Sequence, residues 1–151
     1  GDKVAIPTDA VNLARSLRLL ETLGVIKLKE DVDATKATTA DVTENKKNLE
    51  FVTLDAAQIS RSLDSVAIGV VPGNYAIAAG LDFNSALGVE KLAEGYKNVI
   101  AVRGEDVDSE LGKDLKAAVE SEEFFNAITE DGSEFKSFDR PDWWTAKYGD
   151  K

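Results

Sequence analysis

Two polar residues, Asn12 and Arg15, lie where an apolar stretch passes into an amphipathic one, within "IPTDAVNLARSLRLL" (6–20). The guanidinium fork of an arginine matches the two oxygens of a carboxylate, and an asparagine amide can both donate and accept hydrogen bonds. A helix N-terminus at this point would add unpaired N–H groups and about half a positive charge. A second turn of the same kind, "PGNYA" (72–76), contains Asn74. Together these residues predict a site for a ligand that carries both a carboxylate and an ammonium group.

Each of these signals also has a purely structural interpretation. Arginines in a helix, here Arg15 and Arg18, commonly lie on the solvated surface, and a Gly-Asn pair is a common turn. The acidic residues of 105–123 are typical of a solvated helix face. The stretch "DWW" (142–144) indicates a packing anchor or, alternatively, a stacking platform for sugars. The motifs alone therefore leave the structural and the functional interpretation open.

The composition excludes several classes of chemistry. The chain has 151 residues and contains no Cys, His or Met. A Cys nucleophile, a Ser-His-Asp triad and a zinc site built from thiolate or imidazole are therefore excluded. No EF-hand spacing and no glycine-rich phosphate loop is present, and no nucleophile lies beside a base at the expected strand ends. We predict no catalysis, no cofactor and no metal site.

The charge and the hydropathy narrow the possible partners. With 18 basic and 28 acidic residues the net charge is −10, so most of the surface would repel a phosphate backbone, and we expect no nucleic-acid partner. No apolar run approaches the roughly 20 residues that a membrane span needs. The start of the chain, "GDKVAIP" (1–7), has neither a basic n-region nor a cleavage site.

Four apolar stretches predict the strands that position the two turns, and they lie at 3–7, 49–54, 66–71 and 98–103. Alternation of such strands with helices indicates a parallel sheet with right-handed crossovers. Ligands of such sheets bind beyond the carboxyl ends of the strands, where both turns would lie. We predict an α/β fold: a single lobe with a mostly parallel sheet of four or five strands, flanked by helices.

The helices between these strands carry start signals. Asp9 can cap the first helix, in which Leu13, Leu17 and Leu20 form an apolar stripe. Residues 27–48 are polar and charged, which predicts surface loop with one short helix near 39–45. Further helices are predicted over 55–63, 74–81 and 109–128, and the tail from 129 onward has no clear periodicity.

Three stretches together resemble one protein family over about Lys3 to Arg103: "KVAIPTDAVNLARSLRLLETLGVIKLK", "DVTENKKNLEFVTLDAAQISRSLDSVAIGVVPGNYAIAAGL" and "NVIAVR". They look like the second lobe of the methionine-binding lipoproteins, the NlpA-type periplasmic binding proteins of ABC importers. The resemblance implies a periplasmic-binding-protein-like fold of two lobes with a free amino acid, usually methionine, between them.

The resemblance also implies roles for individual residues. Arg15 would pair with the carboxylate of the ligand, and Asn12 and Asn74 would face the cleft. Thr8 and Tyr75, in the same two turns, complete the predicted ligand site. The implied partners are a methionine-like amino acid and the permease of an ABC importer. The implied location is extracytoplasmic, anchored to the cell envelope by a lipid-bearing Cys that is not among these residues.

The sequence also departs from the family pattern. Where the family typically reads "PNDPTN" this chain reads "PTDAVN", and Pro72 replaces an amide of the cleft. We expect a fragment or truncated form, in which 3–103 is the second lobe and 104–151 returns to a first lobe that is absent. The alternative is a non-catalytic interaction or structural module that keeps the fold and has lost the pocket. Self-association through the faces left by the missing lobe is a further expectation.

Overall fold

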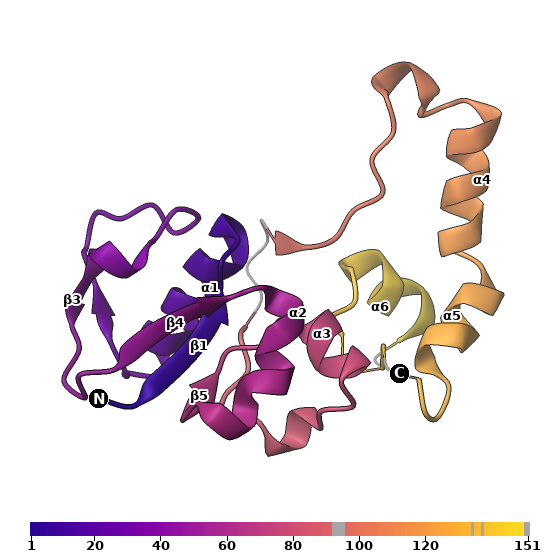
Figure 1. The fold of residues 1–151 in the computed structure, drawn as a ribbon. Coiled ribbons are helices and arrows are strands. Elements are labelled where there is room, and N and C mark those ends of the chain that lie inside the picture. Colours follow the sequence, from indigo (N-terminus) through magenta and orange to yellow (C-terminus); the bar gives the residue numbers. More distant parts are fainter. Residues whose placement is uncertain (92–95, 134, 137, 150–151) are drawn as a thin grey trace. The chain divides into compact units, whose positions relative to one another are not determined.

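The computed structural model describes residues 1–91, 96–133, 135–136 and 138–149 (Figure 1). The chain forms two compact units, Gly1–Leu92 and Ala93–Lys151. The strands are β1 (Lys3–Pro7), β2 (Lys27–Leu28), β3 (Val42–Glu44), β4 (Glu50–Leu54) and β5 (Ile68–Gly69). The α-helices are α1 (Ala10–Thr22), α2 (Ala56–Ile59), α3 (Gly73–Ala78), α4 (Glu110–Val119), α5 (Glu122–Thr129) and α6 (Asp142–Tyr148). Short 3-10 helices are η1 (Thr39–Asp41), η2 (Ser60–Ser65), η3 (Phe83–Ser85) and η5 (Gly104–Asp106).

The first unit is built on a parallel sheet with strand order β4-β1-β5. Strand β1 lies in the centre and pairs over its whole length with β4, from Lys3 opposite Glu50 to Pro7 opposite Leu54. Its pairing with β5 is shorter and ends at Gly69. Since all three strands run the same way, their carboxyl ends lie at one edge of the sheet. The predicted fold class, a parallel sheet flanked by helices, is confirmed.

A proline fits in this central strand because of where β5 stops. The N–H groups of a parallel strand point alternately to its two neighbours. Thr8 donates its N–H to the carbonyl of Leu54 in β4 at 2.9 Å, so position 7 faces the β5 side. Strand β5 pairs only with Val4 and Ala5, so no ladder bond is missing at Pro7.

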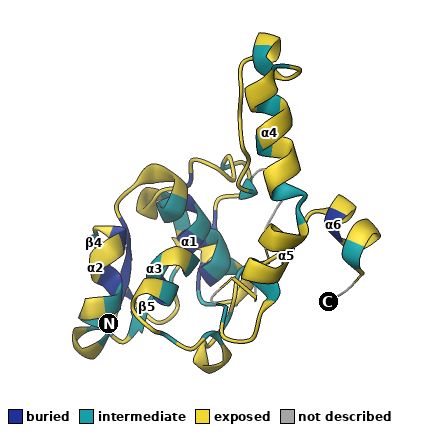
Figure 2. Cartoon of the chain, turned by 90° about the vertical axis from the view of Figure 1, so that its right-hand side faces the viewer, coloured by how far each residue is buried: buried dark blue, intermediate teal, exposed yellow. Residues whose placement is uncertain are grey.

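Helix α1 covers one face of the sheet and forms the main core. The predicted stripe is confirmed for Leu17 and Leu20, which are buried, and Leu13 packs against the same cluster while half-buried. These side chains meet Val4 and Ile6 of β1. Figure 2 shows buried residues, in dark blue, on α1 and on the sheet, and a further buried position on α6.

Helices α2 and η2 cover the opposite face. A Cβ at Gly69 would lie 3.2 Å from the side chain of Ile59 and 2.5 Å from that of Leu63, so β5 and η2 approach closely at this glycine. Gly69 is the register partner of Ala5, and Ile59 is fully buried. The central strand β1 is thus buried between α1 on one side and α2 with η2 on the other, whereas β4 and β5 are only partly buried.

The prediction of a strand at 98–103 is wrong, and the parallel sheet has three strands instead of four or five in the described residues. The stretch is irregular in the structure, and its apolar side chains stay exposed, with Val99 at 82% and Ile100 at 61%. A strand needs a neighbour to satisfy its backbone N–H and C=O groups, and none pairs with this stretch among the residues described.

Other predicted elements differ in their limits. The single helix predicted over 109–128 is two helices, because Ser121 caps α5 by accepting the N–H of Phe124 at 3.0 Å. The loop 27–48 contains the antiparallel pair of β2 and β3, which its polar composition concealed, with η1 where a short helix was predicted. The helix predicted over 55–63 continues as η2, and the one predicted over 74–81 spans Gly73–Ala78 as α3. The tail, which showed no periodicity, contains α6.

The second unit has an aromatic core. Trp144 is only 2% exposed, which confirms its prediction as a packing anchor. Its ring stacks on Phe125 at a centroid distance of 5.3 Å and also contacts Tyr148 and Phe124. Trp143 remains 38% exposed. Within the described ranges, no helix is both long and apolar enough to cross a bilayer.

Candidate carboxylate site

The candidate site lies at the carboxyl edge of the parallel sheet, where β1 leads into α1. Asp9 ends the extended segment with φ −68° and ψ 139°, and its side chain accepts the N–H of Asn12 at 2.9 Å. This is the predicted N-cap, and it sets the first turn of α1 directly after the buried strand. Asn12 and Arg15 follow in the first and second turns of this helix.

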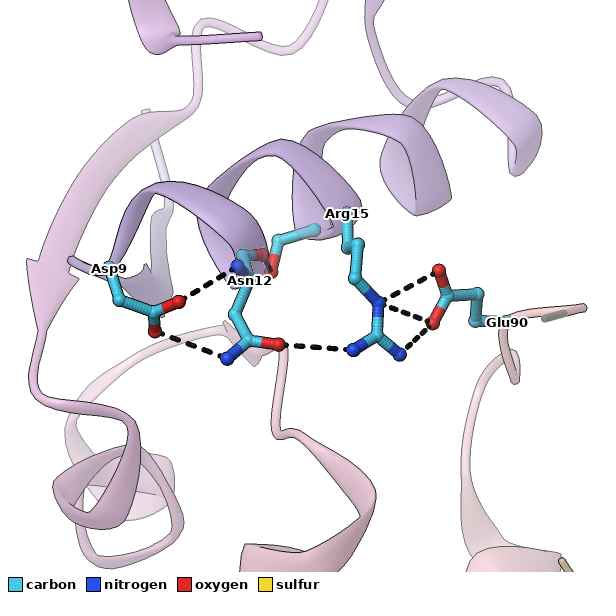
Figure 3. A network of polar contacts seen from close by, with 5 residues as sticks. Asp9, Asn12, Arg15 and Glu90 are labelled. Atoms are coloured by element: carbon cyan, nitrogen blue, oxygen red, sulfur yellow. Dashed lines mark hydrogen bonds and ion pairs between the residues drawn. The ribbon is translucent and has the colours of Figure 1, made fainter. Parts of the chain in front are cut away.

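Four side chains form one chain of polar contacts at this helix start (Figure 3). Asp9 also accepts a hydrogen bond from the side-chain amide of Asn12 at 3.2 Å. The amide oxygen of Asn12 then accepts a hydrogen bond from Nη1 of Arg15 at 3.1 Å. Arg15 in turn donates from Nε to both carboxylate oxygens of Glu90, at 3.2 and 3.1 Å, and from Nη2 to Oε2 at 2.5 Å. The network runs Asp9, Asn12, Arg15, Glu90.

Asn12 and Arg15 occur together because the side chain of Asn12 positions the guanidinium of Arg15. The amide of Asn12 is fixed by Asp9 on one side, so its oxygen points at the guanidinium and restricts how Arg15 can turn. The opposite part of the guanidinium, Nε and Nη2, faces a carboxylate in the two-point arrangement that arginine prefers. The side chains of Arg15 and Glu90 are each 27% exposed, so the pair is accessible to solvent and only partly screened by it.

Arg18, one turn further along α1, has a structural role and is not a member of this network. It pairs with Glu21 at 2.8 Å and donates to the carbonyl of Val32 at 2.8 Å, which ties the helix to the following loop. The pKa of Glu21 is lowered, first because its carboxylate accepts the N–H of Leu28 at 2.8 Å and then because of Arg18. For Arg18 the structural interpretation is therefore sufficient, whereas Arg15 forms its ion pair with Glu90, which comes from a separate segment.

Glu90 was missed by sequence reasoning. It lies 75 positions from Arg15, in a stretch without regular structure, and no local spacing connects the two. A close approach nearby helps to bring it there, because a Cβ on Gly88 would lie 2.8 Å from the side chain of Leu23 at the end of α1. A larger residue at position 88 would require the side chain of Leu23, which is 46% exposed, to shift.

The other predicted site residues lie at the same edge of the sheet, and their side chains are not members of the Asp9–Asn12–Arg15–Glu90 network. Thr8 is exposed immediately after β1, and its backbone is tied to β4. Asn74 and Tyr75 lie in the first turn of α3, which begins after the neighbouring strand β5. Asn74 is exposed and Tyr75 is half-buried. Pro72 occupies the N-cap of α3 and provides no side-chain hydrogen bond there.

The chemistry that this arrangement supports is recognition of a carboxylate. Over the described ranges, no cluster of three or more Asp and Glu side chains is placed to hold a metal ion. A shallow groove of about 650 Å³ lies away from the network, on the α2 face, and it is lined by Lys3, Val52, Leu54, Gln58, Arg61, Ser62, Ser65 and Val66. None of the five predicted site residues lines this groove, so the site rests on the polar network and not on a deep cavity.

Comparison with known proteins gives the family. The sequence profile of the NlpA lipoproteins matches residues 1–140. The chain belongs to the NlpA lipoprotein family. A probable D-methionine-binding lipoprotein MetQ of Vibrio cholerae is 39% identical over 131 residues, which are 86% of this chain and 48% of that protein.

Solved structures agree with the family assignment. A nutrient-binding protein from Burkholderia cenocepacia, determined with bound methionine, has 41% identity and a TM-score of 0.79, covering 91% of this chain and 57% of that one. A periplasmic substrate-binding protein of an ABC transporter from Coxiella burnetii has 40% identity and a TM-score of 0.77, covering 90% and 56%. The chain thus spans about half the length of these similar proteins.

Proposed function

We propose that this chain is the amino-acid-binding second lobe of a solute-binding lipoprotein that serves an ABC importer, with methionine or a similar amino acid as ligand. The observation that carries the proposal is that Arg15 holds a carboxylate at two points while Asn12 orients its guanidinium from the other side. Family members named for methionine binding, at about 40% identity, support the choice of ligand class.

In this proposal each predicted site residue has a role. Arg15 binds the ligand carboxylate, and Asn12 keeps the guanidinium in position. Thr8 and Asn74 supply hydrogen-bond partners to the ammonium and carboxylate groups, and Tyr75 lies beside them at the start of α3. The chain performs no catalysis. Residues 3–103 correspond to the second lobe, and 104–151 to a segment that returns to the first lobe.

The proposed setting follows from the same relatives. We place the protein outside the cytoplasm, attached to the cell envelope, with an ABC importer permease as its partner. Self-association of this chain through apolar surface such as Val99 and Ile100, 82% and 61% exposed, is part of the proposal. Sedimentation velocity over a range of concentrations tests it, and a purely monomeric profile would contradict it.

Binding is best tested by NMR titration with L- and D-methionine, because one lobe supplies half of the contacts and no closure. The loss of ligand freedom still costs several kcal/mol, so we expect a dissociation constant in the millimolar range at best. Amide shifts should cluster at Thr8, Asn12 and Asn74.

The decisive variant is Arg15→Gln, with Arg61→Gln as the matched control. Arg15→Gln removes a charge-assisted pair worth about 1.5 to 3 kcal/mol and should weaken binding about ten- to hundredfold. Arg61 is exposed and lies outside the network, so its replacement should leave binding unchanged. Equal affinity of both variants would reject the carboxylate role of Arg15.

The second candidate function is a non-catalytic interaction module that keeps this fold without a working pocket. Its supporting observation is Pro72 at the N-cap of α3, where the family has an amide and this chain offers no side-chain donor. In that case neither enantiomer of methionine should shift any amide at the edge of the sheet, even at tens of millimolar ligand. Restoring the amide with Pro72→Asn would then be expected to create binding.

A further inference from the structure

Residues 86–91, here called the strap, lie against α1 and bring Glu90 to Arg15. The strap contains no helix or strand. Its residues alternate between contact and exposure: Gly88 and Glu90 are half-buried, whereas Leu87 is 88% exposed and Val89 is 63% exposed. The strap contacts the helix through the close approach of Gly88 to Leu23, at the end of α1, and through the ion pair of Glu90 with Arg15.

These contacts give the strap little apolar anchorage. Exposed Leu87 and Val89 gain almost nothing from burial in this position, since the hydrophobic contribution scales with the area removed from water. Gly88 has no side chain to bury. Among the contacts described here, the carboxylate of Glu90 is the charged one that joins the strap to the helix, and its partner is the residue proposed to bind the ligand.

In the proposed binding mode the ligand carboxylate takes the side-on fork of the guanidinium, Nε and Nη2, which is the fork that Glu90 occupies in the structure. Glu90 occupies Nε and Nη2, and Asn12 occupies Nη1. A second carboxylate on the Nε and Nη2 side would meet the first one at close range, and like charges at that distance repel. The two carboxylates must therefore alternate at this fork.

We propose that Glu90 is a built-in competitor of the ligand, and that the strap is a self-inhibitory latch which the ligand carboxylate displaces from Arg15. The inference rests on the proposed function, because it assigns regulation to the same site. When the ligand binds, Glu90 moves into solvent with residues 86–91, and the guanidinium exchanges one carboxylate for another without losing its hydrogen bonds.

The size of the effect follows from how often the latch is open. Apparent affinity falls in proportion to the fraction of molecules whose site is free. A tethered carboxylate acts at an effective concentration in the millimolar range or above, comparable to the ligand concentrations expected here. If the latch is closed in about nine molecules of ten, removing the Glu90 charge should tighten methionine binding roughly tenfold.

The test uses the full chain and the substitution Glu90→Gln. This change keeps the size of the side chain and removes the charge. The matched control is Glu30→Gln, the same chemical change at an exposed residue of the same unit that takes no part in the network. The probes are L-methionine, D-methionine and methioninamide, which lacks the carboxylate, and far-UV circular dichroism checks that each variant is folded.

We expect Glu90→Gln to bind methionine about tenfold more tightly than the parent chain, Glu30→Gln to behave like the parent, and Arg15→Gln to lose binding. Methioninamide should gain nothing from Glu90→Gln. The amides of Leu87 and Val89 should shift on methionine binding in the parent chain, and in Glu90→Gln they should already resemble the ligand-bound state. A merely structural ion pair would not couple these amides to the ligand.

Two results would overturn the inference, and they differ in what they imply. If Glu90→Gln and the parent chain bind methionine equally while Arg15→Gln loses binding, the latch is rejected and the proposed carboxylate site stands. If Arg15→Gln binds methionine as tightly as the parent chain, or if neither the parent chain nor any variant binds methionine, both the latch and the proposed function are rejected.

Discussion

Asp9 should stabilise the first unit and position Asn12, and two substitutions separate these effects. Its carboxylate accepts the backbone N–H of Asn12 at 2.9 Å as a helix cap and the side-chain amide of Asn12 at 3.2 Å. Asp9→Ala removes both bonds. Asp9→Ser keeps an oxygen that can cap the helix but is too short to reach the amide as well.

The expected magnitudes follow from capping energetics. Loss of a cap costs about 1 kcal/mol, within a range of about 0.5 to 2, and for a unit of this size that lowers the unfolding midpoint by roughly 4 to 8 °C. Asp9→Ser should recover most of this stability. Both variants should bind methionine more weakly than the parent chain, because Asn12 no longer has a fixed orientation toward Arg15.

The assay must report on the first unit alone. Both tryptophans belong to α6 in the second unit, so tryptophan fluorescence is unsuitable. Hydrogen exchange of the α1 amides, followed over a range of temperatures, reports on α1 itself. An Asp9→Ser variant as unstable as Asp9→Ala would show that the amide contact and not the cap provides the stability, and unchanged exchange in Asp9→Ala would refute the reasoning entirely.

Three further predictions concern stability. Leu17→Ala should lower the free energy of unfolding of the first unit by about 2 to 5 kcal/mol in urea titrations, because the side chain is fully buried, whereas Leu87→Ala, at an 88% exposed position, should change it little. The pKa of Asp41 is lowered to about 2 by the backbone N–H and hydroxyl of Thr38 and by Lys29, below its usual value near 4. Its ionised form therefore stabilises the fold above about pH 4, and this contribution should disappear as the pH falls from about 4 to about 2. Carbon-detected NMR titration of the Asp41 carboxyl should show a midpoint near pH 2, and a midpoint near pH 4 would contradict the prediction. Asp41→Asn should flatten the pH dependence of stability between about pH 4 and about pH 2. Trp144→Phe should remove the blue-shifted fluorescence of a buried indole and destabilise the second unit, whereas Trp143→Phe should leave both nearly unchanged; equal effects of the two substitutions would count against a distinct packing role for Trp144.

The first strand and helix could be predicted from sequence because their signals are local. An apolar run stopped by Pro7, a capping Asp9 and leucines at helical spacing all refer to neighbours within a few residues, and the structure confirms each of them. The failure at 98–103 has the opposite cause. Val99 and Ile100 have the composition of a strand, but a strand also needs a partner, and composition does not state whether one is present.

The candidate site likewise has one part that local sequence signals predict and one part that they do not. Asn12 and Arg15 lie three positions apart on one helix, so their contact follows from helical geometry. The contact of Arg15 with Glu90 depends on how an irregular segment crosses α1, which no periodicity encodes. The contributions of Thr8, Asn74 and Tyr75 to ligand binding remain predictions, since their common place at the sheet edge follows from the strand order alone.

The central position of β1 also sets the order in which the first unit can assemble. Its partners lie far along the chain, Glu50 opposite Lys3 and Ile68 opposite Val4. During synthesis the apolar strand therefore leaves the ribosome well before either neighbour exists, and contacts of such high contact order form slowly. Until residue 54 has emerged, both edges of β1 are open to pairing with other chains, and the edge that β5 covers stays open until residue 69 has emerged. Chaperone dependence and aggregation should accordingly be highest for nascent chains that end between α1 and β5.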